Sequence, residues 1–265
     1  MLSTSFASPS VSSAGSPPAP PPAVTAAQMA EVDRLAVDRF GVDLLQMMEL
    51  AGSHLAEVVR LELGGDLRGR TVVVAVGPGN NGGGGLAAAR HLANRGARVH
   101  AVLARPAARL AEAGRHQLAT LLGMGADCCV MTYDLRDDDL AAMLGAADAV
   151  VDAVLGYSLR GAPRDEVARL LGFVNGSGRP VVSLDVPSGV DPDTGQAPGL
   201  AVAAAATLTL ALPKTGLLTA AGRAAAGKLY LGDLGLPAAL YARLGIEPGM
   251  PFAAGPLVRL EALDV

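Results

Sequence analysis

Apolar positions along the chain fall into short β-branched runs that alternate with segments of helical spacing. The first helical segment starts at Thr25, a suitable N-cap, and repeats Met29, Val32, Leu35 and Ala36 on one face. A second runs from about 44 to 63 and ends at two glycines. Further helices are predicted at Leu86–Asn94, Ala107–Leu122, Asp137–Leu144, Arg164–Phe173 and Pro237–Leu244. Strands are predicted at Thr71–Val76, Arg98–Leu103, Asp127–Met131, Ala149–Asp152, Pro180–Leu184, Thr207–Leu212 and Lys228–Leu231.

The predicted strands are continuous apolar runs, such as the VVVAV that ends at Val76, and do not alternate apolar with polar residues. Strands buried on both faces have this pattern, which predicts an α/β fold with a mostly parallel, doubly wound sheet. Residues 25–265 are expected to form this single domain. Residues 1–24 are rich in Ser, Pro and Ala and contain no Lys or Arg, so we expect a disordered tail without a secretory or transit signal.

Composition excludes several classes of partner. The net charge of −4 and the 3% aromatic content, with no Trp, disfavour nucleic-acid binding. The most apolar stretch, Gly199–Leu212, is too short for a span of about 20 residues, so no membrane partner is expected. The two cysteines, Cys128 and Cys129, are adjacent in a predicted strand and face opposite sides, which fits a reduced cytoplasmic protein.

The segment after the first strand carries the strongest chemical signal. Residues 77–85 read GPGNNGGGG, and a helix is predicted to follow from Leu86. Free backbone amides in a glycine loop, together with a helix N-terminus, favour binding of a phosphate. The spacing matches neither the dinucleotide fingerprint nor a P-loop, which disfavours an ordinary NAD-dependent dehydrogenase.

Polar residues follow three later strands. Asp152 precedes a loop with two glycines and Arg160, Asp185 lies at a strand tip, and Lys214 offers a cation to the same edge of the sheet. In such sheets ligands bind at the carboxyl ends of the strands, so Asp185 is expected to enter a cleft. Asn81, Asp152 and Ser188 supply oxygen ligands that suit a monovalent cation better than zinc.

These segments, in this order, resemble the NAD(P)H-hydrate epimerase family (YjeF N-terminal domain-like), which includes the apolipoprotein A-I-binding protein of eukaryotes. The resemblance covers roughly residues 25–236. It rests on the helical Gln28-Met29 and Met48–Gly52 segments and on four motifs. These motifs are GPGNNGGGGL, VVDAVLGYSLRG, SLDVPSGVDPDTG and LALPKTG.

The resemblance implies a Rossmann-like three-layer αβα sandwich that interconverts the R and S forms of hydrated NADH and NADPH at C6 of the nicotinamide ring. It implies that Asp185 contacts the reacting part and acts as the catalytic carboxylate, and that Asn81, Asp152 and Ser188 hold one K⁺ per subunit. The substrate-binding residues it implies are Asn80, Asn81, Gly82, Gly83, Gly84, Gly156, Tyr157, Ser158, Leu159, Arg160, Gly161, Ala162 and Asp185. It further implies a homodimer. Because the family domain is often fused to an ADP- or ATP-dependent dehydratase, which does not fit in this chain, we expect a separate dehydratase as the pathway partner.

The chain departs from the family pattern at three positions. Gly84 stands where the family usually has Asp, Leu50 where it commonly has Asn, and Arg160 where it often has Lys. The alternative function is therefore a catalytically silent nucleotide- or protein-binding module of the same fold. Conversion of the R-hydrate to the S-hydrate separates the two.

Overall fold

The computed structural model describes residues 20–124, 128–131 and 135–260 and folds around one eight-stranded sheet. The strand order is β3-β2-β1-β4-β5-β6-β7-β8; the first seven strands pair in parallel, and β8 pairs antiparallel with β7. The strands are β1 Thr71–Val76, β2 Arg98–Leu103, β3 Cys128–Met131, β4 Ala149–Ala153, β5 Val181–Leu184, β6 Ala206–Leu210, β7 Lys228–Gly232 and β8 Leu257–Leu260.

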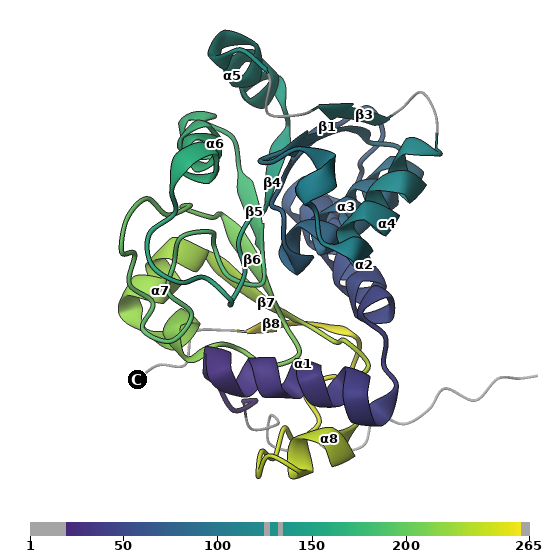
Figure 1. The fold of residues 1–265 in the computed structure, drawn as a ribbon, viewed down its shortest axis with the longest axis vertical. Helices are drawn as coiled ribbons and strands as arrows, with labels where there is room; N and C mark the ends of the chain where they lie inside the picture. The colour runs from purple at the N-terminus through teal and green to yellow at the C-terminus, as the bar shows by residue number, and fades with distance from the viewer. Residues whose placement is uncertain (1–19, 125–127, 132–134, 261–265) are drawn as a thin grey trace, which may run out of the picture.

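Helices cover both faces of the sheet, which confirms the predicted three-layer α/β fold (Figure 1). In β1, Val72 and Val74 join a core with α2, α3 and α4, whereas Val73 and Ala75 join a second core with α5 and α6. The helices are α1 Ala26–Phe40, α2 Leu44–Glu62, α3 Asn80–Asn94, α4 Glu112–Leu122, α5 Asp137–Ala146, α6 Asp165–Gly176, α7 Ala220–Ala226 and α8 Ala238–Ala242, with short 3₁₀ turns η1 Ala107–Arg109 and η2 Thr215–Leu218.

The predicted strand boundaries hold to the residue for β1 and β2 and shift elsewhere by one or two residues. The strand β6 stops at Leu210 because Ala211 adopts a left-handed φ of 61° and turns the chain. The edge strand β8 was not predicted: it is four residues long and mostly half-buried, so it lacks the continuous apolar run of the central strands.

The start of α3 corrects the sequence prediction. The helix begins at Asn80, with Gly79 as its N-cap, and not at Leu86 as predicted. The NNGGGG segment therefore forms the first turns of the helix. Gly82, Gly83, Gly84 and Gly85 are all buried there. A β-carbon built on Gly85 would lie 2.4 Å from that of Ala153 on β4, and one on Gly82 would lie 2.0 Å from the Gly77 carbonyl oxygen. The glycines therefore let a helix press against the sheet.

The boundary of the N-terminal tail also shifts. Residues 1–19 of the expected tail lie outside the described residues. Val24, which was assigned to the tail, is buried and forms a parallel bridge with Lys214 through hydrogen bonds to the neighbouring Pro213 and Thr215. The folded domain therefore includes Val24. Within the described ranges, no helix is both long and apolar enough to cross a bilayer.

Candidate active site

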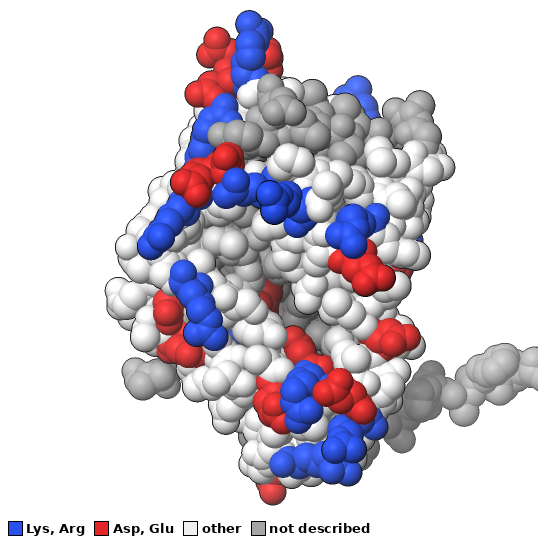
Figure 2. All heavy atoms as spheres, in the orientation of Figure 1, with Lys and Arg blue, Asp and Glu red and all other residues white. Residues whose placement is uncertain are grey.

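A cavity of about 810 Å³ lies at the carboxyl ends of β1, β4 and β5. The chain reverses its direction of sheet growth between β1 and β4, and parallel sheets bind ligands at such a switch point. Helices α1 and α2 supply the opposite wall, including Met29, Asp33 and Met48. Figure 2 shows a hollow on this face with basic side chains along one rim; Arg105, Arg160 and Arg164 are the arginines that line the cavity.

The N-terminus of α3 points its free amides toward this cavity. Gly79, Asn80 and Asn81 line it. In the part of the chain that the structure describes, no acceptor is found for the amide N–H groups of Asn80, Asn81 and Gly82, whereas Gly83 donates to Gly79 O at 3.3 Å. Three free amides at the positive end of a helix can bind an anion. The predicted phosphate site is thus a helix start and not a flexible loop.

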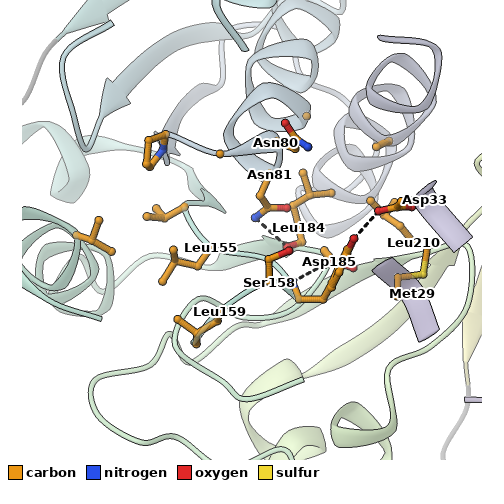
Figure 3. A pocket seen from close by; sticks show the side chains of 18 of the residues that line it. Met29, Asp33, Asn80, Asn81, Leu155, Ser158, Leu159, Leu184, Asp185 and Leu210 are labelled. Carbon is orange, nitrogen blue, oxygen red and sulfur yellow. Dashed lines mark hydrogen bonds between the residues drawn. The ribbon is translucent and has the colours of Figure 1, made fainter. Parts of the chain in front are cut away.

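Asp185 follows β5 at the base of the cavity (Figure 3). Its φ of 69° is a left-handed conformation that Asp tolerates better than most residues and that often marks functional positions. The turn is held by the Asp185 amide, which donates to Leu208 O at 2.6 Å. This conformation directs the carboxylate away from the strand axis, where Oδ2 accepts a hydrogen bond from the Tyr157 amide at 2.8 Å.

Lys214 forms a buried ion pair with Asp185. Its Nζ lies 2.5 Å from Asp185 Oδ1, and both side chains are at most 5% exposed. The ammonium also donates to Leu210 O at 3.0 Å and Thr209 Oγ1 at 3.4 Å. Burial of a charge costs free energy unless the charge is paired and hydrogen-bonded, so each group stabilises the charged form of the other.

Tyr157 connects Asp185 to a second carboxylate. The Tyr157 hydroxyl donates to Asp33 Oδ2 at 2.5 Å, and Asp33 comes from α1 on the opposite wall (Figure 3). Burial raises the pKa of Asp33, against the hydrogen bond from Tyr157. Burial together with the Asp33 charge also raises the pKa of the Tyr157 phenol, which keeps it a donor. Two acidic groups therefore reach the same cavity from different elements.

Two of the three predicted cation ligands, Asp152 and Ser188, form a buried cluster behind the cavity. Asp152 is fully buried and accepts from the Ser188 hydroxyl at 2.6 Å, the Ser188 amide at 2.9 Å and the Ser183 hydroxyl at 2.8 Å. Burial raises the pKa of Asp152. Asn81 does not contact this pair directly: its Nδ2 donates to Leu184 O at 3.3 Å. The structure thus brings Asp152 and Ser188 together and leaves Asn81 as a separate contact.

Most of the predicted substrate residues line the cavity. These are Asn80, Asn81, Gly84, Gly156, Tyr157, Ser158, Leu159, Arg160, Ala162 and Asp185. Gly82, Gly83 and Gly161 are not among its lining residues; Gly82 and Gly83 are buried, with Gly77 and Met48 as their nearest neighbours. Gly156 fits tightly, since a β-carbon there would lie 2.9 Å from Asp185 Oδ2 and 3.2 Å from Asn81 Oδ1.

Asp33 was not identified from the sequence, and Lys214 was given no role beyond its charge. The missed signal for Asp33 is its place on the apolar face of the first helix, four residues after Met29, which also lines the cavity. A carboxylate on that face needs a polar partner. The partner, Tyr157, is more than 120 residues away and cannot be found from helical spacing.

The chain is similar to known proteins over most of its length. A family model described as "YjeF-related protein N-terminus" matches residues 44–216. An NAD(P)H-hydrate epimerase of Dehalogenimonas lykanthroporepellens is 46% identical over 242 residues, which are 91% of this chain and 94% of that protein. A bifunctional NAD(P)H-hydrate repair enzyme Nnr of Salinibacter ruber is 39% identical, but this chain spans only 43% of it. The crystal structure of the yeast protein ynu0 superposes with a TM-score of 0.77 at 26% identity, over 90% of this chain and all of the yeast chain.

Proposed function

Because the chain belongs to the family of YjeF-related N-terminal domains, we propose that it is an isomerase that epimerises hydrated NADH and NADPH at C6 of the nicotinamide ring. The observation that carries this is the position of Asp185, a buried carboxylate at the base of the cavity, in reach of the Tyr157 amide and paired with Lys214. A relative of nearly the same length that is 46% identical is named as this epimerase.

The cavity divides the tasks of binding and chemistry. The free amides at the start of α3 and the arginines that line the cavity suit the diphosphate of the substrate. Asp185 lies deeper in the cavity, and we place the nicotinamide ring beside it. The hydrate is a hemiaminal: the ring nitrogen can expel the C6 hydroxyl as water once that oxygen gains a proton. Water then returns to the other face and loses a proton. Asp185 transfers a proton to or from the oxygen on C6, a role that raises the reaction rate by about 10² to 10⁴-fold.

The alternative of a catalytically silent module is not favoured. Of the three departures, Leu50 is not among the residues that line the cavity, and Arg160 keeps the positive charge of the Lys it replaces. Gly84 lines the cavity, and a β-carbon there would meet the flexible end of Leu184 at 2.8 Å. The chain thus lacks one carboxylate at this wall but retains Asp185 and its partners.

We also propose one K⁺ held by Asn81, Asp152 and Ser188. Asp152 is fully buried, and no ion pair is described for it in residues 20–124 and 135–260. One carboxylate with neutral oxygens suits a hard monovalent cation. The Ser188 hydroxyl can instead donate its hydrogen bond to Leu155 O at 3.2 Å, which would leave Asp152 Oδ1 free to bind the ion. The ion would supply positive charge behind the substrate loops. The midpoint temperature of thermal unfolding should be higher in KCl than in choline chloride for the wild type, but the same in both salts for Ser188→Ala. An equal increase in both proteins would contradict the proposed ion site.

The remaining expectations concern the setting of the enzyme. A homodimer would cover apolar side chains that α1 and α2 leave exposed, namely Val37, Leu45, Leu50 and Leu61. Light scattering should then report twice the chain mass of 26.6 kDa. A hydrate dehydratase as pathway partner fits the relatives that are named bifunctional hydrate repair enzymes. A cytoplasmic location fits the adjacent cysteines and the nicotinamide substrate.

The direct test is incubation of the purified protein with the R-hydrate of NADH, with the S-hydrate followed by chromatography. The proposal predicts formation of the S-hydrate well above the rate in buffer. A rate equal to that in buffer, for both the NADH and the NADPH hydrates, would instead support the silent module.

A further inference from the structure

The cavity holds two carboxylates that enter it from different parts of the fold. Asp33 is carried by α1, and Asp185 follows β5 at the edge of the sheet (Figure 3). Tyr157 lies between them: its backbone amide donates to Asp185 at 2.8 Å, and its hydroxyl, at the far end of the same side chain, donates to Asp33 at 2.5 Å. The two carboxylates therefore accept hydrogen bonds from opposite ends of Tyr157.

Asp33 also has spare capacity for a ligand. Only Oδ2 has a described hydrogen bond, and Oδ1 is not among the buried polar atoms that lack a partner, so this second oxygen is accessible within the cavity. The titratable and charged groups that interact with Asp33 are Tyr157, the Lys214 ammonium, Asp185 and Tyr241. Asp38, on the same helix, differs from Asp33: its side chain is 52% exposed and paired with Arg34.

Inversion at C6 requires proton transfer on both faces of the ring, because the hydroxyl leaves from one face and water returns to the other. One carboxylate reaches only one face of a ring that stays in place. Inverting glycoside hydrolases solve the same problem with two carboxylates about 6.5–9.5 Å apart that flank the reacting carbon and leave room for water. Asp33 and Asp185 both line this cavity, one from α1 and the other from the end of β5, and so offer two carboxylates for the two transfers.

We propose that Asp33 is a second catalytic residue, which exchanges a proton with the C6 oxygen on one face of the nicotinamide ring while Asp185 does so on the other. This rests on the proposed epimerase function. In one direction, the Asp33 proton goes to the leaving oxygen, the C6–O bond breaks, and the ring nitrogen lone pair forms the N1=C6 bond. Water then bonds to C6 on the opposite face, the N1=C6 pair returns to nitrogen, and the proton of that water goes to Asp185. Exchange with solvent restores both groups, and the reverse reaction uses them in opposite roles.

The raised pKa of Asp33, which burial causes, supports this assignment. A carboxyl whose protonated form persists to higher pH is a better proton donor near neutrality. The hydroxyl of Tyr157 stays protonated and holds Asp33 in place.

The test compares Asp33→Asn with Asp38→Asn, the same substitution at an exposed position of the same helix. Each variant is incubated with the pure R-hydrate and, separately, the pure S-hydrate in water enriched in oxygen-18. Chromatography measures inversion, and mass spectrometry measures label in the epimer that has not inverted. Asparagine can still accept the Tyr157 hydrogen bond, and thermal unfolding shows that the variants are folded.

Asp33→Asn is expected to slow inversion by at least about 100-fold. Label should still enter one of the two epimers without inversion at close to the wild-type rate, because Asp185 can expel and return water on its own face. Asp38→Asn should invert the substrate at the wild-type rate.

The proposal is overturned if Asp33→Asn inverts the substrate at a rate within about tenfold of the wild-type rate. It is also overturned if the rates of inversion and of label exchange fall in proportion, or if the wild-type product forms without label. If the wild type itself does not accelerate inversion over buffer, the proposed function fails instead.

Discussion

The position of Gly156 shows how a single residue can determine the placement of Asp185, the proposed catalytic group. It lies where the loop after β4 passes between Asp185 and Asn81, and even a methyl group there would approach both side chains within 3.2 Å. Contacts this short displace the side chain that receives them. Gly156 is thus needed for clearance at the carboxylate, since its φ is not in the left-handed range.

Substitution of Gly156 by alanine should therefore lower the epimerisation rate while the protein stays folded. We expect a loss of about 100-fold in kcat, because displacement of a catalytic group by about 1 Å can cost this much. Gly172→Ala, in α6, is the control, because its β-carbon would meet only Leu200 at an ordinary 3.9 Å. Equal rates for the two variants would show that Asp185 tolerates the displacement.

Asp33 should also affect stability in a pH-dependent way. Burial raises its pKa in the folded protein, so the folded state binds the proton more tightly than the unfolded chain, whose pKa is about 3.9. Stability is then lost as the pH rises from about 4 through the raised folded value. Asp33→Asn removes this loss, so its unfolding free energy relative to wild type should increase from pH 4 to pH 7 in urea titrations. A constant or falling difference would contradict the raised pKa.

At the scale of the element, α3 shows what the sequence could and could not predict. Its glycine run predicted a phosphate site at this edge of the sheet, because glycines after a parallel strand and before a helix have that role in many sheets. The run also contains residues of poor helix propensity, so the helix was expected to start six residues later. Tertiary contacts decide otherwise: only glycine allows α3 to approach β1 and β4 this closely.

The crossing of α2 and α3 depends on the same close approach. A β-carbon on Gly52 would lie 2.6 Å from Ala87 Cβ and 2.7 Å from the Ala88 amide nitrogen. Gly52→Ala should therefore destabilise the protein by about 1–3 kcal/mol in urea denaturation. Gly145→Ala, in α5, meets nothing within 4 Å and should stabilise it by about 0.4–1 kcal/mol. Equal effects would show that the helix pair can separate at little cost.

At the scale of the whole molecule, the positions of the buried strands along the chain were predictable because each is a continuous apolar run between turn residues. The order of these strands in the sheet places the ends of β1, β4 and β5 side by side and so explains why Asn81, Tyr157 and Asp185 meet. The opposite wall was not predictable. How α1 packs across the cavity depends on contacts between segments far apart in sequence, such as Asp33 with Tyr157 and Val24 with Lys214.

The central claim is that this cavity interconverts the two hydrates through Asp185. The most direct measurement starts from each pure epimer of hydrated NADH in turn and follows the R-to-S ratio with wild-type protein and with Asp185→Asn. The wild type should bring both solutions to the same ratio far faster than buffer, and Asp185→Asn should be slower by about 10² to 10⁴-fold. Equal rates for Asp185→Asn and the wild type would contradict it, as would a wild-type rate no faster than buffer.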